Sequence, residues 1–176
     1  MKVLVAYWTQ TGNTKKIAEA IFGEIKGEKE LKKLDEVESL EGYDLAFIGF
    51  PINAFGPAAP AKKFLEKNAK GKNIALFVTH AAPDRKEDFD RYGLSFEEFQ
   101  GWLARCKEPA AGANLVGFFD CQGELSEQIA NFLKKQEDPK LRTFGEMRDR
   151  TLGQPDASRI ERARIFARET LKKFRA

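Results

Sequence analysis

This chain has few of the residues that tie small proteins together or hold metal ions. Among its 176 residues are only two cysteines, Cys106 and Cys121, and a single histidine, His80. Neither the number nor the spacing of these residues indicates a disulfide framework or a zinc site. We therefore expect no structural metal and no disulfide.

Long apolar runs are also missing, and none approaches the roughly 20 residues of a membrane-spanning helix. Met1 and Lys2 lead straight into a short apolar run, without the pattern of a signal peptide. From these features we expect a cytoplasmic protein with no membrane span.

Charge of one sign does not dominate, because the formal net charge is only +3. Residues 140–176 hold eleven basic and five acidic side chains, a net of +6, which leaves −3 for residues 1–139. The signs alternate along the basic end, and no recognisable nucleic-acid-binding module accompanies it. We expect a solvated helix face there and no nucleic-acid partner.

What the sequence does contain is a repeated alternation of strand and helix patterns. Hydrophobic residues make up 42% and charged residues 32%, as in a soluble globular domain. The predicted strands are Lys2–Trp8, Leu31–Val37, Leu45–Phe50, Ile74–Thr79 and Leu115–Cys121. The predicted helices begin near Asn13, span Ala58–Asn68, begin at Ser95, and run behind the last strand over Leu125–Leu133. This order predicts a three-layer, doubly wound α/β fold with a five-stranded parallel sheet.

The pattern changes after Asp138. Residues Pro139–Pro155 show no clear period and are interpreted as a loop with room for a helical turn, and Asp84–Gly93 is also interpreted as a loop. Asp156 or Ser158 caps an extra C-terminal helix. We divide the chain into a domain at 1–138 and an extension at 139–176 whose helix packs on the same domain. A lid or a dimer contact is the alternative, and the oligomeric state stays open.

The most informative stretch is Thr9–Thr14 (TQTGNT), between the first strand and the first helix. Such a junction aims free backbone N–H groups and the positive end of the helix dipole at one point, which suits a phosphate. The stretch lacks the Lys-Ser/Thr ending of a nucleotide P-loop and the spaced glycines of a dinucleotide fingerprint. A simple capped turn is the alternative interpretation.

With Thr-x-Thr-Gly-x-Thr directly after its first strand, the chain resembles the flavodoxin family. The resemblance implies the strand order 2-1-3-4-5 and a bound FMN at the carboxyl ends of the strands. It assigns the FMN phosphate to Thr9, Gln10, Thr11, Gly12, Asn13 and Thr14.

The resemblance also assigns the flavin ring to two further strand ends. These comprise Pro51, Ile52, Asn53, Ala54 and Phe55 after the third strand, and Thr79, His80 and Ala81 after the fourth. Many flavodoxins place a Trp in the first of these loops and a Tyr in the second, and this chain offers instead Phe50 or Phe55, and Phe89 or Tyr92. An ordinary proline-rich turn and a histidine that binds local backbone are the alternatives. Cys121 and Gln122 are candidates for the border of a substrate pocket.

The function implied by the resemblance is an FMN-binding redox protein that carries electrons between partner proteins. The alternative is an FMN-dependent oxidoreductase that uses NAD(P)H and a quinone-type small molecule. A flavin-free interaction module is a third possibility. A receiver domain of a signalling pathway is excluded, because paired acidic residues do not follow the first strand and no Asp follows the third.

Overall fold

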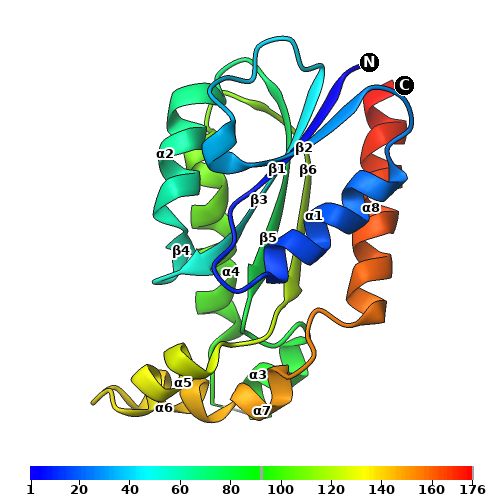
Figure 1. The fold of residues 1–176 in the computed structure, drawn as a ribbon. Coiled ribbons are helices and arrows are strands. Elements are labelled where there is room, and N and C mark those ends of the chain that lie inside the picture. Colours follow the sequence, from blue (N-terminus) through cyan, green and yellow to red (C-terminus); the bar gives the residue numbers. More distant parts are fainter. Residues whose placement is uncertain (92, 176) are drawn as a thin grey trace.

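The computed structural model describes residues 1–91 and 93–175, with a parallel sheet between two layers of helices (Figure 1). Its strands are β1 (Val3–Tyr7), β2 (Lys29–Lys33), β3 (Leu45–Asn53), β4 (Gly56–Pro57), β5 (Asn73–His80) and β6 (Asn114–Gln122). Its α-helices are α1 (Asn13–Glu24), α2 (Ala59–Asn68), α3 (Lys86–Arg91), α4 (Phe96–Lys107), α5 (Glu127–Lys134), α6 (Pro139–Glu146), α7 (Arg148–Thr151) and α8 (Ala157–Arg175). No helix in this described part has the length and apolar character needed to cross a bilayer.

The five long strands lie in the order β2-β1-β3-β5-β6 and all pair in parallel. Val3 of β1 pairs with Lys29 on one side and with Leu45 on the other, which places β1 inside the sheet. The two-residue strand β4 folds back on β3 in antiparallel pairing. The predicted fold class and strand order are confirmed.

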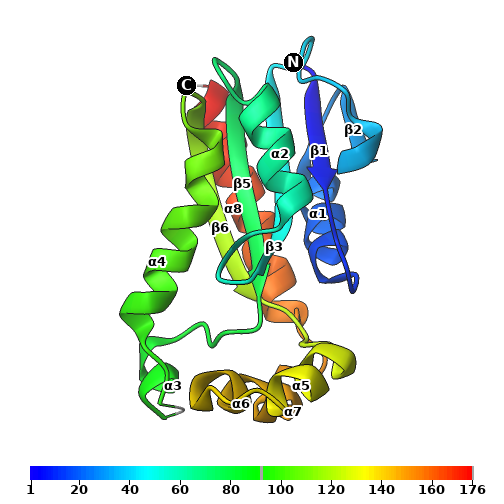
Figure 2. The same cartoon turned by 90° about the vertical axis from the view of Figure 1, so that its left-hand side faces the viewer.

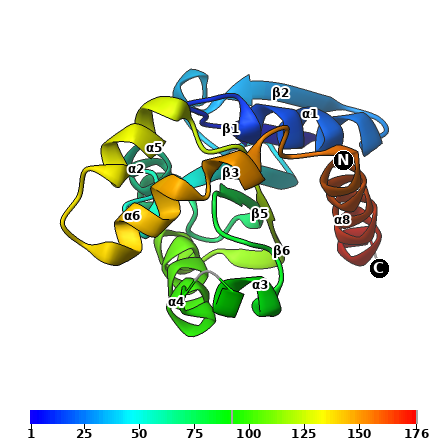
Figure 3. The same cartoon turned by 90° about the horizontal axis from the view of Figure 1, so that it is seen from below.

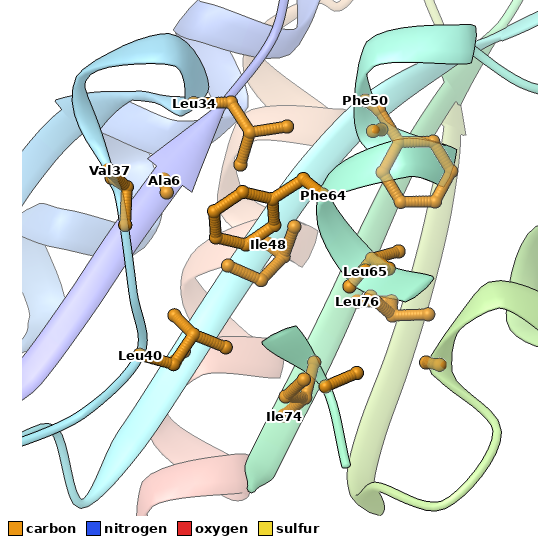
Figure 4. Packing of buried hydrophobic residues seen from close by; sticks show 14 of the residues in the cluster. Ala6, Leu34, Val37, Leu40, Ile48, Phe50, Phe64, Leu65, Ile74 and Leu76 are labelled. Carbon is orange, nitrogen blue, oxygen red and sulfur yellow. The ribbon is translucent and has the colours of Figure 1, made fainter. Parts of the chain in front are cut away.

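Helices cover both faces of the sheet, as the apolar runs of its inner strands require. One face packs against α2 and α4, and Figure 4 shows Ile48 and Phe50 of β3 beside Phe64 and Leu65 of α2. The opposite face packs against α1 and α8. There Phe166 of α8 meets the ring of Phe47 edge-on at 5.9 Å. The C-terminal helix is therefore present and shares a core with the sheet.

Some predicted boundaries are wrong. The second strand ends at Lys33, and the residues that follow form a short 3-10 turn, Leu34–Glu36, whose leucine packs into the core. The third strand continues to Asn53, so part of the predicted loop is strand. Residues Lys86–Arg91 form helix α3 where a loop was predicted, and Tyr92 lies outside the described residues.

The helix expected behind the last strand lies elsewhere. Helices α5, α6 and α7 run across the carboxyl ends of the strands, below the sheet in Figure 2, and Figure 3 shows the molecule from that side. We call residues 124–154 the cap; at its base, Glu124 N donates to Gln154 O at 3.0 Å. The face predicted for Leu125–Leu133 is covered by α8 instead, through Ala163, Ala167 and Leu171. The division of the chain at Asp138 stays a prediction.

Candidate functional site

A narrow cleft of about 70 Å³ opens where the carboxyl ends of β1, β3 and β5 meet the cap. It is lined by Thr9, Gln10, Thr11, Asn13 and Thr14, by Pro51, Ile52 and Asn53, by Thr79, His80 and Ala81, and by Gly123, Glu124, Leu125, Ser126 and Ile129. The fold thus brings all three predicted loops together. Three predicted residues, Gly12, Ala54 and Phe55, do not line the cleft.

The first loop presents unpaired backbone donors at the start of α1. Gly12 adopts φ +94°, a left-handed conformation that glycine takes without strain, and its amide donates to Thr9 Oγ1 at 3.0 Å. The amides of Gln10, Thr11 and Thr14 have no hydrogen-bond partner among residues 1–91 and 93–175. Because a helix N-terminus also carries partial positive charge, this loop is suited to an anion.

The side chains of the loop are less free than its amides. Thr14 Oγ1 lies 2.9 Å from Thr79 Oγ1 in a buried contact that links the first loop to the end of β5. Asn13 Nδ2 donates to Glu124 O at 2.8 Å and thereby holds the start of the cap. One of the two Nδ2 hydrogens of Asn13 is thus used by the cap, and the other stays available. The assignment of Asn13 to the phosphate stays a prediction.

The second loop is a tight hairpin between β3 and β4. Its two turn residues, Ala54 and Phe55, have φ of +47° and +66°, an uncommon conformation for residues other than glycine. Phe50 is fully buried in the core beside α2 and offers no surface to the cleft. Phe55 turns away from the cleft, and its ring centroid lies 4.9 Å from that of Trp102 on α4. Only the first half of the predicted loop faces the cleft.

His80 at the end of the third loop is held by protein groups on both sides of its ring. Nδ1 lies 3.1 Å from the carbonyl oxygen of Ala82, and Nε2 lies 3.1 Å from Asp120 Oδ2. Each ring nitrogen therefore faces an oxygen of the protein. The ring also meets Phe99 edge-on at 4.7 Å. This arrangement matches the interpretation of a histidine that binds local groups.

The fourth side of the cleft, Gly123 to Ile129, was missed at the level of sequence. Gly123 lies so close to α1 that a Cβ there would sit 2.6 Å from Asn13 Nδ2. The Gly123 amide donates to His80 O at 2.7 Å, which joins the residue just before the cap to the third loop. The glycine after the last strand was the available signal, because an isolated glycine often marks a close approach of backbone.

The two residues predicted at the border of a substrate pocket, Cys121 and Gln122, are buried and do not line the cleft. Burial raises the pKa of the Cys121 thiol to about 12, so the sulfur stays protonated at neutral pH. A neutral, enclosed thiol is a poor nucleophile. The cleft therefore offers hydrogen-bond donors and apolar surface, without a nucleophilic sulfur.

A family model described as flavodoxin domain matches residues 4–168. The chain belongs to this family. It is 31% identical over 181 residues to the flavodoxin-like domain-containing protein BilS of Clostridioides difficile (strain CD3), and the match covers 97% of both chains.

Solved structures support the same fold. A flavodoxin from the domain Archaea superposes with a TM-score of 0.58 at 15% identity and covers all of both chains. The general stress protein 14 of Treponema denticola, solved in complex with FMN, has a TM-score of 0.51 at 16% identity, covering 99% of this chain and 98% of its own. At these identities the likeness shows the fold alone.

Proposed function

We propose that this chain binds FMN in the cleft and acts as a redox protein that passes electrons between partners. This proposal rests mainly on the backbone amides of the first loop, at the N-terminus of α1. Several of them have no hydrogen-bond partner among the described residues. Amides and a helix dipole bind a phosphate without a lysine or arginine. Family membership and the FMN complex of the Treponema relative support the same cofactor.

The residues fit the phosphate end of FMN better than the ring end. The volume of the cleft is only about 70 Å³, and the cap residues Glu124, Leu125, Ser126 and Ile129 form one of its sides. The flavin ring is much larger than this volume. Binding the whole cofactor therefore requires the cap to move away from the hairpin, and we expect the cap to control how FMN enters and leaves.

When bound, FMN supplies the electron-transfer chemistry, and the chain supplies position and shielding. The free amides of the first loop hold the phosphate. The Thr14 and Thr79 hydroxyls share one hydrogen bond, which leaves one hydroxyl proton to donate to the cofactor. Contacts with Ala82 and Asp120 fix the orientation of the His80 ring, and the cap limits the access of water to the cleft.

An oxidoreductase that acts on a small molecule is the second candidate. It is favoured by the cap, which covers the strand ends that a docking protein would approach, and by an apolar pocket beside the cleft. A carrier, in contrast, needs a flavin edge that a partner protein can reach.

Two measurements test these proposals. The purified protein should be yellow or should take up FMN with quenching of flavin fluorescence; a colourless protein that refuses FMN would favour a flavin-free interaction module. Steady-state turnover is then measured with NAD(P)H and a quinone, without any added reductase. Turnover would establish the oxidoreductase, whereas its absence together with a stable semiquinone in a redox titration would establish the carrier.

A further inference from the structure

A second pocket, separate from the cleft, lies between the β3–β4 hairpin, α4 and α6. Its volume is about 270 Å³, and four of its eleven lining residues are aromatic. Phe55 comes from the hairpin, Trp102 from α4 and Phe144 from α6, and Phe89, Leu94 and Leu141 complete the apolar lining. We call this the aromatic pocket.

The aromatic rings of this pocket are arranged around an opening and do not fill it. The Trp102 centroid lies 4.9 Å from that of Phe55 and 5.8 Å from that of Phe144, with planes tilted by 44° and 41°. Phe55 remains 42% exposed, although burying such a side chain is worth roughly 1.5–3 kcal/mol. Rings that are tilted and partly exposed leave π faces available to a flat ligand.

The position of Phe55 is imposed by the backbone. Both turn residues of the hairpin are left-handed, a conformation that costs on the order of 1–3 kcal/mol for each residue other than glycine. Arg105 Nε of α4 donates to Phe55 O at 2.9 Å and ties the turn to the pocket wall. A strained turn that holds an exposed aromatic ring over an apolar hollow is typical of a functional position.

Two basic side chains line the pocket, Lys140 and Arg105, and of these two Arg105 is available to a ligand. Lys140 of α6 pairs with Glu98 of α4 at 2.8 Å, and this hydrogen bond raises the pKa of the Lys140 ammonium. Asp138 Oδ1 accepts from the Lys140 backbone amide at the start of α6. The terminal guanidinium nitrogens of Arg105 have no partner among the described residues, so Arg105 is able to bind an anionic group.

Only a few side chains separate the aromatic pocket from the cleft. Ile52 lines the cleft and also packs against the aromatic cluster of α4. A second route runs from His80 in the cleft to Phe99 at 4.7 Å and from Phe99 to Trp102 at 5.8 Å. A molecule in the aromatic pocket would therefore lie beside the flavin site.

We propose that the aromatic pocket binds a flat, conjugated organic anion of about two fused rings. The size follows from the volume, because an apolar cavity of about 150 Å³ holds benzene and this pocket is less than twice as large. The flat shape follows from the three rings, and the anionic group from Arg105. The binding of this molecule does not depend on the proposed function. Its role as the redox partner of the flavin does rest on that proposed function.

The test uses 1,4-naphthoquinone-2-sulfonate as the probe, titrated by calorimetry into the protein saturated with FMN and again without added FMN. Trp8 and Trp102 are the only tryptophans, so a Trp8→Phe background makes Trp102 fluorescence an independent readout. We expect saturable binding that quenches Trp102. Phe55→Ala and Phe144→Ala should each weaken binding about tenfold, whereas Phe132→Ala, at an exposed phenylalanine of α5, should not change it.

Charge is tested with Arg105→Gln. Its affinity for the sulfonate should fall about tenfold, the effect of losing one charge-assisted hydrogen bond, while its affinity for neutral 1,4-naphthoquinone should stay within twofold. Arg168→Gln, at an exposed arginine of α8, is the matched control. An equal loss for both probes would overturn the anionic part of the proposal.

Other outcomes would overturn the pocket itself. These are the absence of saturable binding, binding that Phe55→Ala and Phe144→Ala leave unchanged, displacement of the probe by FMN, and a dimer in sedimentation that Phe55→Ala abolishes. The last two would assign the pocket to the flavin or to a second copy of this chain. Flavin fluorescence reports FMN binding separately, so a protein that binds the probe and not FMN would refute the proposed function alone.

Discussion

The Thr14 side chain links two of the loops that line the cleft, through its contact with Thr79. The buried hydroxyls of Thr14 and Thr79 have two protons and share one hydrogen bond, so one proton is left for a ligand. Thr14→Val removes the hydroxyl that stands on the first loop beside the free amides, and we expect the dissociation constant for FMN to rise about tenfold, as for one lost hydrogen bond to a charged group. Fluorescence titration of FMN measures the change.

Thr143→Val is the matched control, because the Thr143 hydroxyl donates to Pro139 O within α6, away from the cleft. It should leave the FMN affinity unchanged. Equal affinities for Thr14→Val and the unmodified protein would contradict the assignment of the first loop to the phosphate.

At the residue scale, features that depend on a local pattern are predictable from the sequence. The glycine at position 12 is required by a left-handed φ within the turn itself. Asn13 and Phe55 were assigned to the cofactor, but their contacts in the structure depend on residues far away in the chain. Asn13 bonds to a carbonyl 111 residues away, and Phe55 is tied to an arginine 50 residues away. Such contacts follow from tertiary packing and leave no local pattern.

The cap is the element that closes the cleft. Because the Glu124–Gln154 backbone bond holds its two ends together, two glycines are long enough to replace residues 125–153 and to link β6 to α8. We expect this variant to keep the circular dichroism of a folded α/β protein, since α8 retains its place in the core. Its FMN dissociation rate, followed by the recovery of flavin fluorescence, should rise at least tenfold.

A single substitution tests the role of the cap without deleting it. In Gly123→Ala the new methyl group would collide with the Asn13 side chain and weaken its bond to Glu124 O, so FMN should again dissociate faster. Gly101→Ala is the control, because that exposed helical glycine has no neighbour within 4 Å of an added Cβ. Unchanged dissociation in both the deletion and Gly123→Ala would refute the role of the cap.

At the element scale, the spacing of apolar residues predicts where helices form. It does not predict which part of the sheet each helix covers. Most of the predicted range Leu125–Leu133 does form α5, yet Phe132 on this helix is 62% exposed and the helix lies at the strand ends. The helix that covers the sheet beside α1 is α8, and its buried contact residues include the small side chains of Ala163 and Ala167. The start of α6 did carry a local signal, an Asp followed by Pro, but no period was recognised behind it.

At the scale of the whole molecule, the strand order came from family resemblance, because periodicity identifies strands without fixing their neighbours. The register that joins β1 to β3 and β3 to β5 depends on residues more than 25 positions apart. The Thr9–Thr14 turn carried the resemblance, and the family match over residues 4–168 extends it to most of the chain. The space between cap and hairpin is a property of the assembled fold and had no signal in the sequence.

Both cysteines report on the integrity of the whole fold. Cys106 packs on the α2 face of the sheet and Cys121 on the α1 face, and burial raises the pKa of each thiol to about 12. A neutral reagent for thiolates should therefore label neither cysteine in the folded protein at pH 8. Labelling should appear only with global unfolding, and rapid labelling of the native protein would show that one face opens locally.

The same shifts make stability depend on pH in the alkaline range. An unfolded thiol ionises near its ordinary pKa of about 9, while the folded protein keeps its proton until about pH 12. The stabilisation is therefore complete below pH 9 and is lost as the pH rises, by about 1.4 kcal/mol for each thiol at pH 10. Denaturant unfolding of the protein and of the Cys106→Ala/Cys121→Ala variant measures this term, because tyrosine and lysine titrate alike in both. The free energy of unfolding should fall more steeply between pH 9 and 11 when the cysteines are present, and equal slopes would mean that the thiols are not held in the core.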